Sequence, residues 1–160
     1  MQIDPRGARF GAGITTVVLA VGLVTQSAWV LGFQTVVFAL GAVLGLRAAP
    51  YGWVYRVLVR PRLGPPAELE DEAPPRFAQA VGLAFALVAT LGFALGAPVV
   101  GTVATAFALA AAFLNAAFGY CLGCEVYLLA RRVTHRSTPH DPSSSTTSAA
   151  APAASKEVSA

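Results

Sequence analysis

Charged side chains are scarce in this chain, and two long stretches contain none. Asp, Glu, Lys and Arg make up 12% of the 160 residues, whereas soluble domains contain about 25%. No charged residue lies between Phe10 and Leu46 or between Phe77 and Cys124. A chain this short cannot form a soluble core that buries both stretches. The sequence therefore predicts an integral membrane protein in contact with the lipid bilayer.

The two apolar stretches also lack His, so they contain no titratable carboxylate, amine or imidazole. Proton-driven pumps and ion pathways depend on such groups inside the membrane, which disfavours a transporter. Gln34 is expected to form a hydrogen bond with a neighbouring helix. Asn115 is expected either to do the same or to line a polar path to the cysteines. Gly11-x-Gly13 follows no predicted strand, so no cofactor is predicted.

Each apolar stretch has room for two membrane spans, because one span needs about 20 residues. Turns at Gln26-Ser27-Ala28 and Gly96-Ala97-Pro98 divide them. We predict an all-α membrane protein with four transmembrane helices. The predicted order is a polar lead (1–9), spans over 10–25 and 29–46, a loop (47–76), spans over 77–95 and 99–120, an interfacial helix (122–133) and a disordered tail (134–160).

The two halves of the chain resemble each other. Each half is predicted to consist of two spans followed by a short interfacial helix, which covers 54–60 in the first half. Since each half crosses the membrane twice, the copies would share one orientation, giving two parallel two-helix repeats. The matching segments are Arg9-Phe10 with Arg76-Phe77, 37–42 with 106–111, and Tyr55 to Arg60 with Tyr127 to Arg131.

Arginines lie on one side of the predicted spans only, and both turns between paired spans are uncharged. The positive-inside rule then places both termini and the central loop in the cytoplasm, with the spans in the plasma membrane. Arg56 and Arg60 are expected near lipid phosphates. The acidic run from Glu68 to Glu72 predicts a solvated linker, with a docking patch for a basic partner as the alternative. The arginines are Arg6, Arg9, Arg47, Arg56, Arg60, Arg62, Arg76, Arg131, Arg132 and Arg136.

Both cysteines of the chain lie two residues apart, at the end of the fourth predicted span. A helix beginning near Leu122 would lower the pKa of a thiol at its start, most directly that of Cys121, while Glu125 would oppose this. Gly123 is expected to give the loop freedom to bring the two sulfurs together. Redox or sulfur-carrying chemistry by Cys121 and Cys124 is the leading interpretation, with Glu125 able to relay a proton and Asn115 as a secondary candidate.

Two other interpretations of the thiol pair stay open. The cysteines are small apolar residues suited to a helix junction, which is a structural role. Alternatively, Cys121 and Cys124 bind a metal together with His135 and His140, a spacing near that of zinc sites. Against the metal, both histidines lie at the edge of the low-complexity tail.

Several motifs resemble a bacterial integral-membrane family that is frequent in actinobacteria, called domain of unknown function 4395. The resemblance covers about residues 4–133, and it implies no settled activity. It does imply gene neighbours that encode thioredoxin-like and rhodanese-like proteins. The motifs are Asp4-Pro5-Arg6, Arg60-Pro61-Arg62-Leu63-Gly64-Pro65-Pro66, Pro75-Arg76-Phe77-Ala78, Phe113-Leu114-Asn115 and Phe118-Gly119-Tyr120-Cys121-Leu122-Gly123-Cys124-Glu125.

The leading functional hypothesis is a membrane-anchored thiol partner in disulfide exchange or sulfur transfer. Its partner would be a cytoplasmic thioredoxin-like or rhodanese-like protein. The alternative is a non-catalytic membrane scaffold that recruits a soluble partner through the 47–76 loop. A permease for a small sulfur compound is third, and it would need the chain to form a homo-oligomer. No nucleic-acid partner is predicted.

Overall fold

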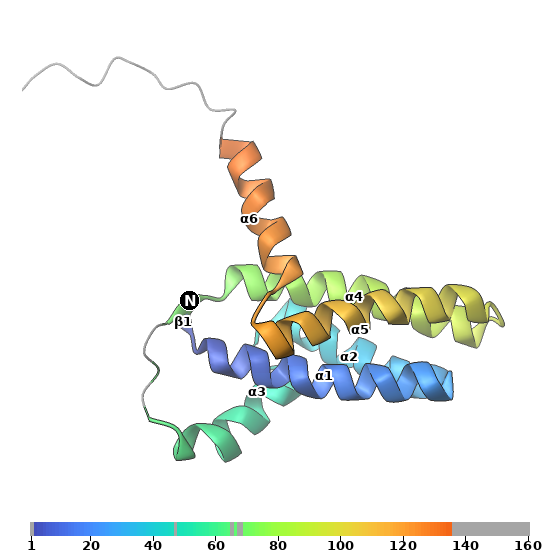
Figure 1. Ribbon diagram of the computed structural model, residues 1–160, viewed down its shortest axis with the longest axis horizontal. Coiled ribbons are helices and arrows are strands. Elements are labelled where there is room, and N and C mark those ends of the chain that lie inside the picture. Colours follow the sequence, from blue (N-terminus) through green and yellow to red (C-terminus); the bar gives the residue numbers. More distant parts are fainter. Residues whose placement is uncertain (1, 47, 65, 67–68, 136–160) are drawn as a thin grey trace, which may run out of the picture.

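A computed structural model describes residues 2–46, 48–64, 66 and 69–135. Four long helices lie side by side in a bundle (Figure 1). Successive helices run in opposite directions, so the turns after the first and third long helices lie at one end of the bundle. The tail predicted from residue 134 lies outside the described residues from 136 onward, as do Arg47 and Glu68. The long helices are α1 (Pro5–Thr25), α2 (Ala28–Leu44), α4 (Ala73–Ala94) and α5 (Pro98–Phe118).

Three of these helices, α1, α4 and α5, are long and apolar enough to cross a membrane, whereas α2 is a shorter apolar helix of 17 residues. Many large apolar side chains face outward from the bundle. Trp29 is 90% exposed and Val24 is 84% exposed, which a soluble monomer rarely tolerates over a continuous surface. The predicted helical class is confirmed, and the three long apolar helices suggest a membrane protein.

Helix boundaries follow capping signals more closely than hydropathy. α1 begins at Pro5, five residues before the predicted span, because the Asp4 carboxylate accepts a hydrogen bond from the Arg6 N–H at 3.0 Å. α4 begins at Ala73, with two prolines in its first turn. The residues predicted as a polar lead therefore form strand β1 (Gln2–Ile3) and the first turn of α1.

The core of the bundle is narrow and built from small side chains. Its buried cluster consists of two leucines and three alanines, so helix backbones approach closely. At the α4–α5 turn, a Cβ on Gly92 would lie 2.6 Å from the Gly101 backbone nitrogen. The Thr35 and Thr90 hydroxyls form a hydrogen bond of 3.0 Å between α2 and α4, as expected for packing in lipid. The cluster is Leu19, Leu31, Ala89, Ala104 and Ala108.

Two arginines hold helix ends together across the bundle. Arg9 of α1 donates to the carbonyl oxygens of Ala116 and Ala117 at the end of α5, at 3.4 and 3.5 Å. Arg76 of α4 donates to the carbonyl oxygens of Ala42 and Val43 at the end of α2, at 2.7 and 2.6 Å. Both contacts place a cation where the helix dipole is negative and carbonyls lack helical partners.

The connection from α2 to α4 is largely ordered rather than a plain loop. It contains α3 (Pro50–Val54), a π-helical stretch η1 (Tyr55–Val59) and a 3₁₀ turn η2 (Arg60–Arg62), so the helix predicted over 54–60 begins earlier, at Pro50. Strand β2 (Glu70–Asp71) then pairs antiparallel with β1.

The prediction of a solvated acidic linker is wrong for Glu72, which is 8% exposed. Its Oε1 accepts the Leu46 N–H at 2.9 Å, just beyond the end of α2. The Leu46 N–H lies outside any helix, so it has no helical acceptor. The buried Glu72 carboxylate accepts its hydrogen bond instead, a role that a solvated side chain would not have.

Glu72→Ala should lower the free energy of unfolding by roughly 1–3 kcal/mol, because it leaves the Leu46 N–H without its acceptor. Thermal unfolding of the purified protein in detergent measures this. Glu70→Ala removes an exposed carboxylate from the same run and serves as the matched control, with an expected change within about 0.5 kcal/mol. Equal losses in both variants would contradict the structural role of Glu72.

Candidate thiol site

The two cysteines lie at the junction of α5 and α6 (Leu122–His135), where α6 projects away from the bundle (Figure 1). α5 ends at Gly119, whose left-handed backbone (φ 70°) suits glycine. The N–H groups of Gly119 and Tyr120 donate to the carbonyl oxygens of Asn115 and Leu114. This tight ending turns the chain and places Cys121 directly before α6.

Cys121 occupies the N-cap position of α6. Its carbonyl oxygen accepts the Glu125 N–H at 3.1 Å, the first hydrogen bond of the helix. Its Sγ accepts the Cys124 N–H at 3.4 Å. The sulfur thus takes the place that a Ser, Thr or Asp oxygen occupies at an ordinary helix start, facing the positive end of the dipole.

This geometry separates the acidities of the two thiols. A hydrogen bond from the Cys124 thiol lowers the pKa of Cys121 to about 7, with help from the backbone N–H groups of Cys124 and Gly123 and against burial and the Glu125 charge. The same hydrogen bond raises the pKa of Cys124, as do burial and the nearby charges of Glu70 and Glu125. Near pH 7 about half of the pairs have therefore lost one proton, and the negative charge is stabilised mainly on Cys121.

Gly123 has a different role from the predicted one. It lies within α6, and a Cβ at this position would come within 2.6 Å of both Cα and Cβ of Ala78. Glycine is therefore needed for the close approach of α6 to α4, and the interpretation as a flexible loop residue is wrong. The pair therefore lies where α6 packs against α4, with both thiols partly buried.

The structure supports no site role for Asn115, and it does not describe the side chains of His135 and His140. Asn115 is half-buried in α5, and no side-chain hydrogen bond joins it to another helix within the described part of the chain. His140 lies outside the described residues, and only the backbone of His135 is described. Among the described residues no group of three His, Cys, Asp or Glu could hold a metal ion. The four-residue metal site stays a prediction because it depends on both histidines.

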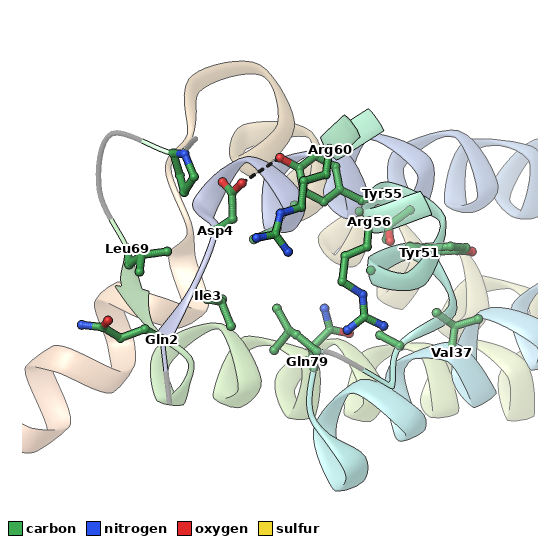
Figure 2. Close-up of a pocket in the computed structure, with 18 residues that line it drawn as sticks. Gln2, Ile3, Asp4, Val37, Tyr51, Tyr55, Arg56, Arg60, Leu69 and Gln79 are labelled. Atoms are coloured by element: carbon green, nitrogen blue, oxygen red, sulfur yellow. Dashed lines mark hydrogen bonds between the residues drawn. The ribbon is translucent and has the colours of Figure 1, made fainter. Parts of the chain in front are cut away.

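A cavity of about 380 Å³ at the same end of the bundle was not predicted (Figure 2). It lies between α1, α3, η1 and α4, and its lining includes Tyr51, Tyr55, Arg56 and Arg60. The sequence carried a signal for it, since the tyrosines and the arginines are each spaced four apart and so share a helix face. Both arginines line this cavity, and their contact with lipid phosphates stays a prediction.

The β1–β2 ladder lies close to both the cavity and the thiol pair. Glu70 of β2 is close enough to raise the pKa of Cys124. Its partner across the ladder, Ile3 of β1, lines the cavity. The two sites are therefore neighbours without sharing a residue.

The chain belongs to the family described as Domain of unknown function (DUF4395), whose model matches residues 3–132. The match covers all six α-helices up to the last turn of α6 and includes both cysteines. No curated protein matches this chain. No solved structure matches it either.

Alkylation of Cys121 should rise with pH to half its maximum rate near pH 7, because only the thiolate reacts and the pKa of Cys121 is lowered to about 7. Cys124→Ala removes the thiol donor, so the midpoint should shift to higher pH. Glu125→Gln removes a charge that raises the pKa of Cys121, so the midpoint should shift to lower pH. Iodoacetamide labelling followed by mass spectrometry measures each profile. A midpoint near pH 9 in the unchanged protein would refute the N-cap thiolate.

Proposed function

We propose that this protein is a membrane-anchored thiol partner in disulfide exchange or sulfur transfer, in which Cys121 attacks and Cys124 resolves. The observation that carries the proposal is the position of the Cys121 sulfur at the N-cap of α6, within 3.4 Å of the Cys124 N–H. Helix N-termini stabilise thiolates, and the thiolate is the nucleophile in these reactions. A structural cysteine at a junction has no need of this placement.

In disulfide exchange, the Cys121 thiolate attacks one sulfur of a disulfide in the partner. A mixed disulfide forms, and the other partner sulfur leaves as a thiolate. Cys124 then loses its proton and attacks the Cys121 sulfur, which releases the second partner thiolate. The pair becomes a disulfide and the partner gains two electrons. The reverse sequence oxidises the partner.

In sulfur transfer, the Cys121 thiolate attacks the outer sulfur of a persulfide on the partner. The partner's cysteine leaves as a thiolate, and Cys121 becomes a persulfide. Attack by Cys124 on the inner sulfur would then close the disulfide and release hydrosulfide. The Cys121 sulfur already lies close to Cys124, 3.4 Å from its backbone nitrogen.

The partner would meet an apolar surface around the thiols. Phe118 is 72% exposed and Tyr120 is 50% exposed, while Glu70 and Glu125 add negative charge close to Cys124. A cytoplasmic thioredoxin-like or rhodanese-like protein fits this setting, because such proteins present a reactive sulfur to other proteins.

The full arrangement that we propose is four transmembrane helices in two parallel repeats, with α3–η1 and α6 at the cytoplasmic surface of the plasma membrane. Matching contacts in the two halves support the repeat. Phe10 packs against Tyr55 with ring centroids 5.8 Å apart, and Phe77 packs against Tyr127 at 5.7 Å. The crossed contacts of Arg9 and Arg76 with helix ends also correspond.

Cys124→Ser should trap a mixed disulfide between Cys121 and the partner in cells, because the resolving thiol is gone while a hydroxyl remains to donate to the thiolate. Cys121→Ser should trap none. Acid-quenched, alkylated membranes run without reductant show the adduct as a heavier species, and mass spectrometry identifies the joined peptides.

Membrane insertion of both variants, measured on the same fractions, is the control. Trapping by Cys121→Ser alone would reverse the assigned roles. Two unmodified thiols in the unchanged protein under oxidant and under every sulfur source, with no adduct in either variant, would contradict the proposal.

Cysteine labelling should test the proposed topology in a Cys121→Ser/Cys124→Ser background. Thr25→Cys and Ala97→Cys mark the two turns, and Gly64→Cys marks the central connection. A maleimide that cannot cross the membrane should label both turns in intact cells, and Gly64→Cys only after permeabilisation. If α2 does not cross the membrane, Thr25→Cys and Gly64→Cys would be labelled from the same side instead.

A further inference from the structure

One side of α6 presents apolar side chains away from the bundle. Leu122 is 40% exposed, Val126 is 55% exposed and Leu129 is 63% exposed. They follow one another at intervals of four and three residues, so they share one side of the helix. We call these three residues the α6 stripe. α6 is also more amphipathic than any of the four long helices. A helix of this kind is typical of the boundary between a membrane and water.

The α6 stripe lies on the side of the helix opposite to Cys124. Each residue of an α-helix adds about 100° of rotation. Leu122 and Val126 lie two residues before and two residues after Cys124, so each is turned roughly 200° away from it. Arg131 lies seven residues after Cys124 and returns to the side of the cysteine. One side of α6 is therefore apolar, and the other carries a thiol and a cation.

α6 is fixed across the direction of the four long helices rather than along it (Figure 1). Two contacts near the start of α4 hold it there. A Cβ on Gly123 would come within 2.6 Å of Ala78, and the ring centroids of Tyr127 and Phe77 are 5.7 Å apart. If the long helices cross a membrane as proposed above, a helix that runs across them lies along the membrane surface.

The β1–β2 ladder indicates which side of α6 is directed toward the membrane. The ladder lies beyond the bundle, ahead of the first turn of α1 (Figure 1). Glu70 of this ladder is close enough to raise the pKa of Cys124, so the Cys124 side of α6 is directed toward the end of the bundle. The α6 stripe is then directed the opposite way, along the flank that faces lipid. Arg132 lies eight residues after Cys124, between the two sides, where its side chain can reach headgroup phosphates.

We propose that α6 binds the cytoplasmic leaflet of the membrane through the α6 stripe, with Leu122, Val126 and Leu129 among the upper acyl chains and Arg132 on lipid phosphates. The Cys124 side then faces water, from which a soluble partner approaches. Lipid is the occupant because the stripe is directed toward the bilayer and has a cation at its edge, which suits an anionic leaflet. The inference rests on the membrane arrangement of the proposed function and not on thiol exchange.

Spin labels on the full-length protein test the proposal in a Cys121→Ser/Cys124→Ser background. Val126→Cys and Leu129→Cys place a label on the α6 stripe. Leu128→Cys is the matched control, because Leu128 is also apolar and 43% exposed but lies one turn after Cys124, on its side. In vesicles of phosphatidylglycerol and phosphatidylcholine, both stripe labels should be several-fold less accessible to a water-soluble nickel chelate than the Leu128→Cys label. They should also be more accessible to oxygen, which concentrates in lipid.

A charge on the stripe should reverse this protection. Leu129→Glu should make the label at Val126→Cys accessible to nickel, because a carboxylate is unfavourable among acyl chains and anionic headgroups. Leu128→Glu should leave that label protected. Both variants should unfold within a few degrees of the unchanged protein, since both side chains are exposed.

Two results overturn the proposal. Equal access of nickel to all three labels would place α6 in water. Protection of the stripe labels from both nickel and oxygen would mean that protein covers the stripe, either a second copy or another segment of this chain. If either result appears while the turn labels still report four spans and Cys124→Ser still traps an adduct, the proposed function stands and this inference alone fails.

Discussion

The ends of α2 and α5 determine how the functional end of this molecule is built, and each end is held by an arginine from the other half of the chain. The last carbonyls of a helix have no helical partners, and leaving them unpaired next to lipid is costly. Arg76 satisfies the end of α2, and Arg9 satisfies the end of α5. Each half therefore supplies the arginine that caps the last helix of the other half.

The segments that continue the chain beyond these two helix ends differ between the halves. After α5 comes a glycine turn and a sulfur-capped helix. After α2 comes the Leu46 N–H bound by Glu72, then a π-helical segment that borders a cavity. The same supporting arrangement thus carries the thiol pair on one side and two arginines on the other.

Hydropathy and the positions of turn-forming residues were sufficient to predict the helical class and the turns near Ser27 and Ala97. They also predicted a helix beginning at Leu122, directly after Cys121. These features depend on local signals, which are long uncharged stretches and helix-breaking residues. The buried position of Glu72 and the cavity could not be predicted in this way. Glu72 lies in an acidic run that looks solvated, and its partner is the backbone of Leu46, 26 residues away.

A lone amide in an apolar helix suggests a partner on another helix, but the described residues provide no such side-chain partner for Asn115. It lies near the end of α5, and its backbone carbonyl oxygen serves the turn at Gly119. Whether a polar residue faces a neighbour depends on helix rotation, which composition does not specify. The spacing of Arg56 and Arg60 was visible in the sequence, but the facing groups come from α1 and α4 and appear only once the chain is folded.

The contact between Gly123 and Ala78 limits how the chemistry of the thiol pair can change. The two residues between paired cysteines are the natural place to adjust a reduction potential, since they surround the sulfurs without bearing them. Here one of the two is fixed by the approach of α6 to α4. Leu122 is 40% exposed and is the remaining variable position. For the proposed thiol exchange, this leaves Leu122 within the motif, and charges outside it such as Glu70, as the positions that could adapt the pair to a different partner.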